Sequence, residues 1–299
     1  MVHVDTFSEH RRYLFGLAYR MTGSAADAED LVQEAWLRWT RASEEEVRTP
    51  RAYLTTVLTR LAINHMQSAS VRREEYVGEW LPEPVLTTDT RDPAELAESL
   101  QMAFLILLES LSPAERAVFL LAEVFEYPHA EIAGIVGKSE ESCRQMLRRA
   151  RQAVAQRRSR FHPSEEQAEK VTGRFIQVVE HGDLEGLMSM LHEDIVLYSD
   201  GGGRTRAAIN PIYGRDRVAR FLLGIARKRE GLKRYGVQIN DQPGVLGFSD
   251  GLAQTAMVLD IERDRVQTVY IVVNPDKLQT LPTEEGIHGN SNTATTPEL

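Results

Sequence analysis

The alternation of apolar and polar residues between Glu131 and Arg151 predicts a helix-turn-helix. An apolar face at helical spacing precedes Gly137, which supplies the turn, and Ser139 is placed to cap the next helix. That helix carries apolar residues on one side and basic or amide residues on the other: Cys143, Met146, Leu147 and Ala150 against Arg144, Gln145, Arg148, Arg149 and Arg151. Such a helix suits the major groove of DNA, where guanidinium groups reach guanine edges or phosphates. An ordinary helical hairpin with a solvated basic face has the same pattern, so both interpretations stay open.

Residues 1–77 also have helical periodicity, with a break at Thr22-Gly23-Ser24 and a new helix start at Pro50. The second of these helices places Ala28, Leu31, Val32, Ala35, Trp36 and Trp39 inward and an acidic face outward, formed by Asp27, Glu29, Asp30, Gln33 and Glu34. The third has an apolar stripe of Tyr53, Leu54, Val57, Leu58 and Leu61, and a polar side with Arg60, Asn64, His65 and Gln67, followed by Arg72 and Arg73.

The rest of the chain divides into a linker, a second helical domain and an α+β domain. Prolines mark residues 78–93 as an extended linker. Residues 94–160 are helical, with a helix start at Ser112-Pro113. From 164 to 281 two helices precede β-branched, alternating segments, which predicts an α+β domain with a curved antiparallel sheet. Residues 282–299 are expected to be disordered. The fold class is therefore multidomain: two all-α domains followed by an α+β domain.

Composition narrows the function classes without deciding among them. The net charge of −9 does not exclude DNA binding, because no acidic residue interrupts the basic run from Arg144 to Arg160. No apolar run reaches the length of a membrane helix, and no signal-peptide core is present, so we expect a cytoplasmic protein without a membrane partner. Cys143 is the lone cysteine and is expected to be a small buried residue rather than a redox sensor. Scattered histidines predict no metal site, and no cofactor is expected.

Two sets of motifs resemble bacterial extracytoplasmic-function (ECF) sigma factors. The first is Leu17 to Ser24 with Asp27 to Ala35, continued by Pro50 to Leu54 and Asn64. The second is Leu111 to Arg116 together with the helix-turn-helix. The resemblance covers roughly residues 5 to 160. It implies that the acidic face binds core RNA polymerase, and that Arg60, Asn64, His65, Arg72 and Arg73 hold the melted minus-ten promoter element.

In the same family the helix-turn-helix reads the minus-thirty-five element. The corresponding residues here are Ser139, Ser142, Arg144, Gln145, Arg148 and Arg149. Met146 stands where many members carry an arginine, so the preferred bases do not follow from the resemblance.

The remaining motifs resemble a subgroup of ECF sigma factors that carries a fused SnoaL-like domain, which is a curved sheet wrapped by helices around a cavity. These motifs are Trp80-Leu81-Pro82-Glu83-Pro84, Asp200-Gly201-Gly202-Gly203-Arg204 and Asn274-Pro275-Asp276-Lys277-Leu278. Large apolar residues in a linker need a docking site. We therefore expect the glycine loop to hold the linker, with Asp200 and Arg204 setting its register and the third motif latching it. A flexible hairpin turn is the plainer interpretation of the glycines.

Together these features predict a sigma factor that binds core polymerase and promoter DNA and is regulated by its own third domain, so that an anti-sigma factor is dispensable. A small ligand in the third domain's cavity could shift the regulation. An enzyme is the second hypothesis, with His192, Tyr198, Asp200, Tyr213 and Tyr270 as cavity candidates. A repressor or activator acting without polymerase is the third, but it has no need of the acidic helix.

Overall fold

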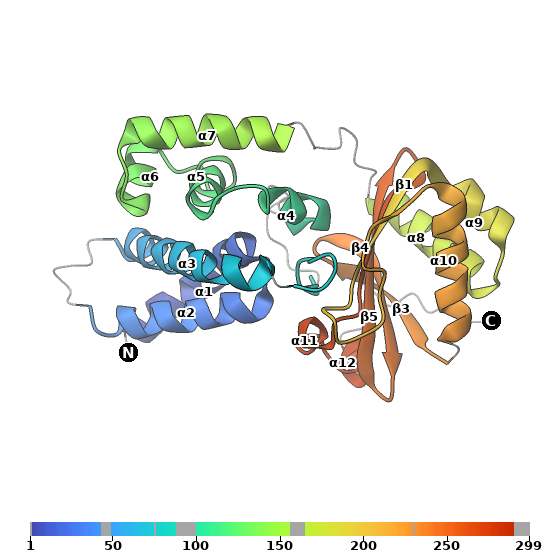
Figure 1. Cartoon of the computed structure of the whole chain (residues 1–299). Helices are drawn as coiled ribbons and strands as arrows, with labels where there is room; N and C mark the ends of the chain where they lie inside the picture. Colours follow the sequence, from blue (N-terminus) through green and yellow to red (C-terminus); the bar gives the residue numbers. More distant parts are fainter. Residues whose placement is uncertain are drawn as a thin grey trace. The chain divides into compact units, whose positions relative to one another are not determined.

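A computed structural model describes residues 2–42, 49–74, 76–87, 100–155, 165–229 and 231–289 (Figure 1). The chain divides into two compact units. The helical unit contains Met1–Glu75, Pro93–Leu100 and Phe104–Arg158, and the mixed unit contains Tyr76–Asp92, Gln101–Ala103 and Ser159–Leu299. Most of the predicted linker therefore clusters with the third domain, although residues 88–93 lie outside the described part.

The helical unit contains both predicted all-α domains. The first consists of α1 (Val2–Thr22), α2 (Ala25–Trp39) and α3 (Pro50–Glu74). The second consists of α4 (Met102–Leu108), α5 (Pro113–Glu123), α6 (His129–Val136) and α7 (Glu140–Ala155). Helices α1, α2 and α3 pack on one another, α5 packs on α6 and α7, and α3 also contacts α5 and α6.

Local capping explains where these helices begin and end. The Ser24 side chain accepts a hydrogen bond from the Asp27 backbone N–H at the start of α2. Ser112 and Glu115 form a reciprocal capping box at α5, with Pro113 in its first turn. Gly137 ends α6 at φ 70°, and the Ser142 N–H donates to Ser139 Oγ at 3.2 Å. The predicted helix starts and the turn of the helix-turn-helix are confirmed.

The mixed unit is an α+β domain with a six-stranded sheet. Its helices are α8 (Glu165–Glu180), α9 (Leu184–Met190), α10 (Arg215–Lys228), α11 (Pro275–Leu278) and α12 (Glu284–Gly289). Its strands are β1 (Leu191–Asp200), β2 (Ile212–Tyr213), β3 (Lys233–Ile239), β4 (Gln242–Ser249), β5 (Leu252–Glu262) and β6 (Arg265–Val272). The strand order is β2-β1-β6-β5-β4-β3.

The sheet differs from the expectation in its pairing and in its helices. β1 pairs with β6 in parallel, so the sheet is mixed rather than antiparallel. Helix α10 lies between β2 and β3 in the sequence, so the helices do not all precede the sheet. The spacing of Val218, Ala219, Leu222 and Leu223 was the signal for it, because these residues form one buried stripe. Helix α12 falls in the segment expected to be disordered, where Glu284 accepts a hydrogen bond from Tyr235 Oη at 2.7 Å.

Helices α8, α9 and α10 cover one face of the sheet, as Figure 1 shows. The core between them contains Phe175 and Leu187 from the helices, and Leu197, Val269 and Ile271 from the strands. None of the helices in the described residues is long and apolar enough to span a membrane. Within that same part of the chain, no group of three or more acidic, histidine or cysteine side chains is arranged to hold a metal ion.

Candidate functional surfaces

The acidic face of α2 lies opposite its buried stripe, as predicted. Three carboxylates have partners: Glu29 with Arg11 at 2.6 Å, Glu34 with Arg38 at 3.0 Å, and Asp27 with His65 at 3.2 Å. Asp30 and Gln33 are exposed and have no side-chain partner among the described residues. Exposed ion pairs contribute little to stability. The face can therefore exchange its present partners for the basic residues of another protein at small cost.

The polar side of α3 is partly occupied. The Arg60 guanidinium donates to the backbone carbonyls of Ile135 at 2.9 Å and Gly134 at 2.8 Å. Both carbonyls lie in the last turn of α6, where the helix dipole favours a cation. Asn64 is exposed, His65 pairs with Asp27 on α2, and the side chains of Arg72 and Arg73 lie outside the described part. Arg60, which is predicted to hold the minus-ten element, thus contacts the second helical domain instead.

Two buried polar contacts accompany Arg60 in joining the first helical domain to the second. The hydroxyl groups of Tyr13, Thr55 and Tyr127 lie 3.0 to 3.1 Å from one another. Burial is the main reason that the pKa of Tyr13 is raised above its ordinary value. Arg116 is 1% exposed and donates to the carbonyls of Met21 at 2.6 Å and Leu108 at 2.9 Å. Sequence reasoning missed these contacts, because the partners are backbone groups or distant hydroxyls.

Helix α7 has the two faces that its sequence predicts. Cys143, Met146, Leu147 and Ala150 are buried, and Arg144, Gln145, Arg148, Arg149 and Arg151 are exposed. Burial raises the pKa of the Cys143 thiol, as expected for a small core residue. Three of the arginines form ion pairs: Arg144 with Glu140, Arg149 with Glu115 at 3.1 Å, and Arg151 with Glu123 at 2.6 Å. In the described chain Gln145 and Arg148 have no such partner, so they are the side chains most ready to contact DNA.

Within the mixed unit, the linker is bound to the third domain by a buried polar cluster that we call the linker clasp: Tyr76, Leu81, Asp200, Asn274 and Lys277. Asp200 is fully buried and accepts hydrogen bonds from Tyr76 Oη at 2.5 Å, the Leu81 N–H at 2.9 Å and Lys277 Nζ at 2.8 Å. Lys277 also donates to the Leu81 carbonyl, and Asn274 Nδ2 donates to Tyr76 Oη at 2.9 Å. The predicted contact among the three motifs is confirmed, whereas its regulatory role stays a prediction.

The apolar part of the linker is buried with the clasp. Leu81 is 1% exposed, and Pro82, Glu83 and Pro84 are also buried. The Lys277 ammonium lies 4.0 Å from the centre of the Trp80 ring, a cation–π arrangement. Tyr76, which precedes the motif and which sequence reasoning missed, has a pKa raised above its ordinary value by burial and by its hydrogen bond to Asp200. The phenol therefore stays protonated and donates to the carboxylate.

The glycine loop has the shape that this contact requires. Gly202 has φ +57°, and a Cβ there would overlap the Asn274 side-chain amide. A Cβ on Gly201 would overlap the Thr205 carbonyl. Arg204 differs from the expectation, because its exposed side chain lies 3.4 Å from Asp276 and does not bind the linker. Asp200 alone sets the register from this loop.

Further along, the linker runs beside the edge strand β3. Leu86 forms an antiparallel bridge with Ile239, and the Thr87 N–H donates to the Gln238 carbonyl at 3.1 Å. Val85 and Asn240 exchange two more hydrogen bonds, at 2.9 and 3.2 Å. Residues 76–87 are thus held on the third domain from the clasp to the sheet edge.

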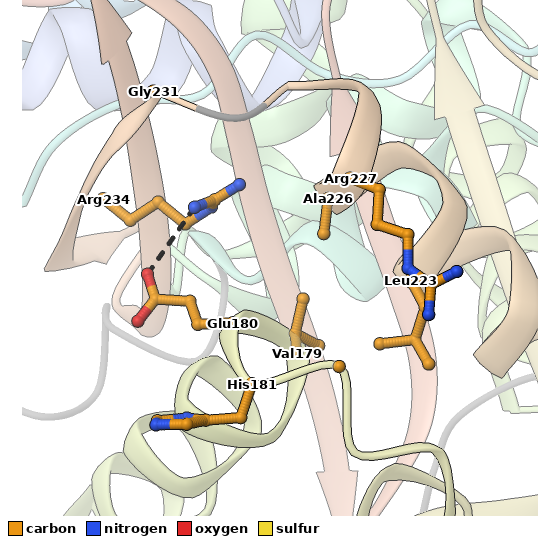
Figure 2. Close-up of a pocket in the computed structure, with 9 residues that line it drawn as sticks. Val179, Glu180, His181, Leu223, Ala226, Arg227, Gly231 and Arg234 are labelled. Carbon is orange, nitrogen blue, oxygen red and sulfur yellow. Dashed lines mark ion pairs between the residues drawn. The ribbon is translucent and has the colours of Figure 1, made fainter.

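The residues of the enzyme hypothesis do not gather around one cavity. Asp200 belongs to the clasp, Tyr213 is 60% exposed, and Tyr198 and Tyr270 stack on each other with ring centres 5.8 Å apart. A cavity at the other end of the helices contains none of the proposed residues, His192 included. Figure 2 shows it between the end of α8, the end of α10 and the start of β3.

Comparison with known proteins covers nearly the whole chain. Residues 6–72 match the family model of Sigma-70 region 2, and residues 101–154 match Sigma-70, region 4. The chain is 36% identical to the ECF RNA polymerase sigma factor SigJ of Mycobacterium tuberculosis H37Rv, over 95% of this chain and 96% of that protein. It is 33% identical to the probable ECF RNA polymerase sigma factor SigI of the same strain, over 93% and 95%. The crystal structure of Mycobacterium tuberculosis SigJ superposes with a TM-score of 0.74 and 34% identity, covering 92% of this chain and 97% of that one.

Proposed function

The chain belongs to the ECF RNA polymerase sigma factors, and on that premise we propose that its third domain controls, within the same chain, the promoter-specific transcription that it directs. Sigma factors are non-catalytic subunits that bind core polymerase and promoter DNA, and they work where the polymerase is, so we place this protein in the cytoplasm. The linker clasp is the observation that carries the proposal.

We assign the binding roles to the surfaces described above. The acidic face of α2 binds core polymerase, the polar side of α3 holds the minus-ten element, and α7 reads the minus-thirty-five element. The assignment is supported by the matches to regions 2 and 4 and by the exposure of Asp30, Gln145 and Arg148. Arg144 and Arg149 would first exchange their surface carboxylates for phosphates or bases, at little cost.

Contacts between the two helical domains make binding dependent on their separation. Arg60 cannot donate to the α6 carbonyls and to the DNA backbone with the same N–H groups. Opening the pair would free Arg60 together with the hydroxyl groups of Tyr13 and Tyr127. We infer that promoter binding and the closed pairing compete, so that anything that favours separation raises transcription.

The clasp governs how far the two helical domains can separate, because the linker joins them. While residues 76–87 are held on the third domain, they cannot lengthen the connection between the two helical domains. Without the clasp, these twelve residues could span up to about 40 Å when fully extended, so the limit on separation would be relaxed. Because the third domain is tethered, the contact is effectively at about millimolar concentration, so no separate anti-sigma protein is needed to maintain it.

Transcription in vitro tests the function and its control together. Core polymerase and a promoter pool would be combined with the full chain, a truncation after residue 163, and a truncation just before Asn274. We expect transcripts only when the protein is added, and a changed output for both truncations. If no form yields transcripts or co-elutes with core polymerase, the sigma assignment fails. If all three forms transcribe equally, regulation in cis fails while the sigma function stands.

A single substitution isolates the clasp from the rest of the third domain. Lys277→Met removes the cation that joins Asp200 to the linker carbonyl. Arg204→Ala is the matched control, because it removes a cation from the neighbouring loop that does not touch the linker. We expect the first variant to change promoter output and the second to match the native chain. Equal output from both, with the third domain still folded by circular dichroism, would reject control through the clasp.

A further inference from the structure

The third domain contains a cavity of about 440 Å³ that no part of the proposed function uses. It lies where α8 ends, beside the last turns of α10 and the first residues of β3 (Figure 2). Its volume is in the lower part of the range of about 300 to 1,000 Å³ that is typical of small-molecule sites. All the residues that line the cavity belong to the third domain.

Apolar side chains line part of this cavity. Val179 and Leu223 belong to the packing between the helices and the sheet, and Ala226 follows on the next turn of α10. Figure 2 shows Arg234 and Arg227 on opposite sides of the cavity, with Leu223 next to Arg227. An apolar surface of this kind stabilises a hydrocarbon group, because the group leaves water on binding.

Two guanidinium groups give the cavity a positive rim. Arg227 is exposed, and the described residues provide it with no hydrogen bond or ion pair. Arg234 is 20% exposed, forms a long ion pair with Glu180 at 3.6 Å and donates to the Leu232 carbonyl at 3.4 Å. Lys228 and Arg229 follow Arg227 directly in the sequence. The rim therefore attracts an anion although the protein as a whole is acidic.

We propose that this cavity binds a small hydrophobic carboxylate, with the hydrocarbon part against Val179, Leu223 and Ala226 and the carboxylate on Arg227. A planar guanidinium group binds a carboxylate through two parallel hydrogen bonds, which fixes the orientation of the ligand. Arg234 lies on the opposite side of the cavity, where it is paired with Glu180, so Arg227 is the main anion-binding group. The site goes beyond the regulatory role proposed above, and its binding can be measured without any transcription.

Isothermal titration of the full chain with octanoate tests the proposal. Octanamide has the same chain length without the charge, so we expect it to bind at least about tenfold more weakly. Arg227→Gln should weaken octanoate binding by a similar factor. Arg217→Gln is the matched control, because Arg217 is an exposed arginine on the same helix, about 15 Å away and outside the cavity. It should leave binding unchanged.

Three outcomes would overturn the proposal. Equal binding of octanoate and octanamide would show that the arginines do not recognise the ligand. Sulfate is an anion without a hydrocarbon group. If it bound the cavity as tightly as octanoate does, the apolar wall would not contribute to binding. If octanoate fails to bind and Arg227→Gln instead weakens the binding of duplex DNA, the basic rim is a nucleic-acid surface. Failure of the sigma function would appear separately, as absent transcription with octanoate binding intact.

Discussion

The linker clasp and the contact between the two helical domains both join segments far apart in the sequence, but they use polar groups of different accessibility. In the clasp, Asp200 is fully buried and Lys277 is 6% exposed. In the helical pair, Arg60 is exposed and donates to carbonyls at the end of α6, although Arg116 of the same pair is 1% exposed. Unpairing a buried charge costs far more than exchanging an exposed partner for water or phosphate.

This difference suggests a division between a permanent and a reversible contact. The clasp keeps the linker on the third domain because neither Asp200 nor Lys277 can find another partner without unfolding part of it. The helical pair can open whenever polymerase or DNA offers Arg60 an equivalent acceptor. The Tyr13 and Arg116 contacts add to the closed state. Arg116 keeps the Leu108 carbonyl and Glu109 of its own domain when the pair opens, and loses its bond to the Met21 carbonyl.

The largest effect is expected from breaking the clasp. Lys277→Met leaves Asp200 as an uncompensated buried charge, which should lower the free energy of unfolding of the third domain by about 3 to 5 kcal/mol. The double variant Asp200→Asn with Lys277→Met should recover part of that loss, because it removes both charges. Chemical denaturation measures the free energy of unfolding of the single and the double variant. A loss below about 1 kcal/mol in the single variant would mean that the pair is not buried as described.

A smaller effect should distinguish the α7 arginines that form ion pairs from those that have no partner in the described chain. Arg148→Ala should weaken binding to a minus-thirty-five duplex by about 1 to 3 kcal/mol, because its guanidinium has no partner in the described chain. Arg151→Ala removes an arginine of the same helix that is already paired with Glu123, and should change binding less. Fluorescence anisotropy with labelled DNA measures both. A larger loss of affinity in Arg148→Ala than in Arg151→Ala would support Arg148 as the DNA contact. The reverse order would place the DNA on the Arg151 side of the helix.

A still smaller effect should come from loosening the helical pair without touching a proposed DNA contact. Tyr127→Phe removes one hydroxyl group from the cluster with Tyr13 and Thr55, which should destabilise the closed pair by about 0.5 to 1.5 kcal/mol. Binding to a single strand that carries the minus-ten element should then strengthen up to about tenfold, because less energy is needed to release Arg60 from α6. Unchanged or weaker binding would mean that the closed pair does not oppose DNA binding.

The smallest effect is expected at alkaline pH. The pKa of Tyr76 is raised above its ordinary value of 10.0, so the folded state binds this proton more tightly than the unfolded state does. The resulting stability is complete below about pH 10 and is lost as the pH rises through the raised pKa. Tyr13 and Tyr270 have raised pKa values as well, so the native chain should be compared with Tyr76→Phe from about pH 8 to 11. Identical slopes of stability against pH would exclude a contribution from Tyr76.

Much of the fold could be predicted from the sequence, because helix starts, turns and amphipathic faces are local properties. Ser24, Ser112 and Gly137 act within one turn of their own positions, and the two faces of α7 follow from its spacing alone. The linker motif carried its own signal too, because Trp80 and Leu81 in a proline-rich segment required a surface to cover them. Helix α10 carried the same kind of signal and was missed in favour of the strand patterns around it.

The sequence by itself determined which segments form helices and strands, which faces are acidic, basic or apolar, and which three motifs belong together. Only the tertiary structure decided where those faces are directed: Arg60 to the carbonyls of α6, Tyr76 into the clasp, β1 beside β6 in parallel, and Arg227 and Arg234 to one cavity. The physical reason is the distance along the sequence over which each interaction acts. Periodicity and capping act over a few residues, whereas burial and the choice of a hydrogen-bond partner depend on segments brought together from across the chain.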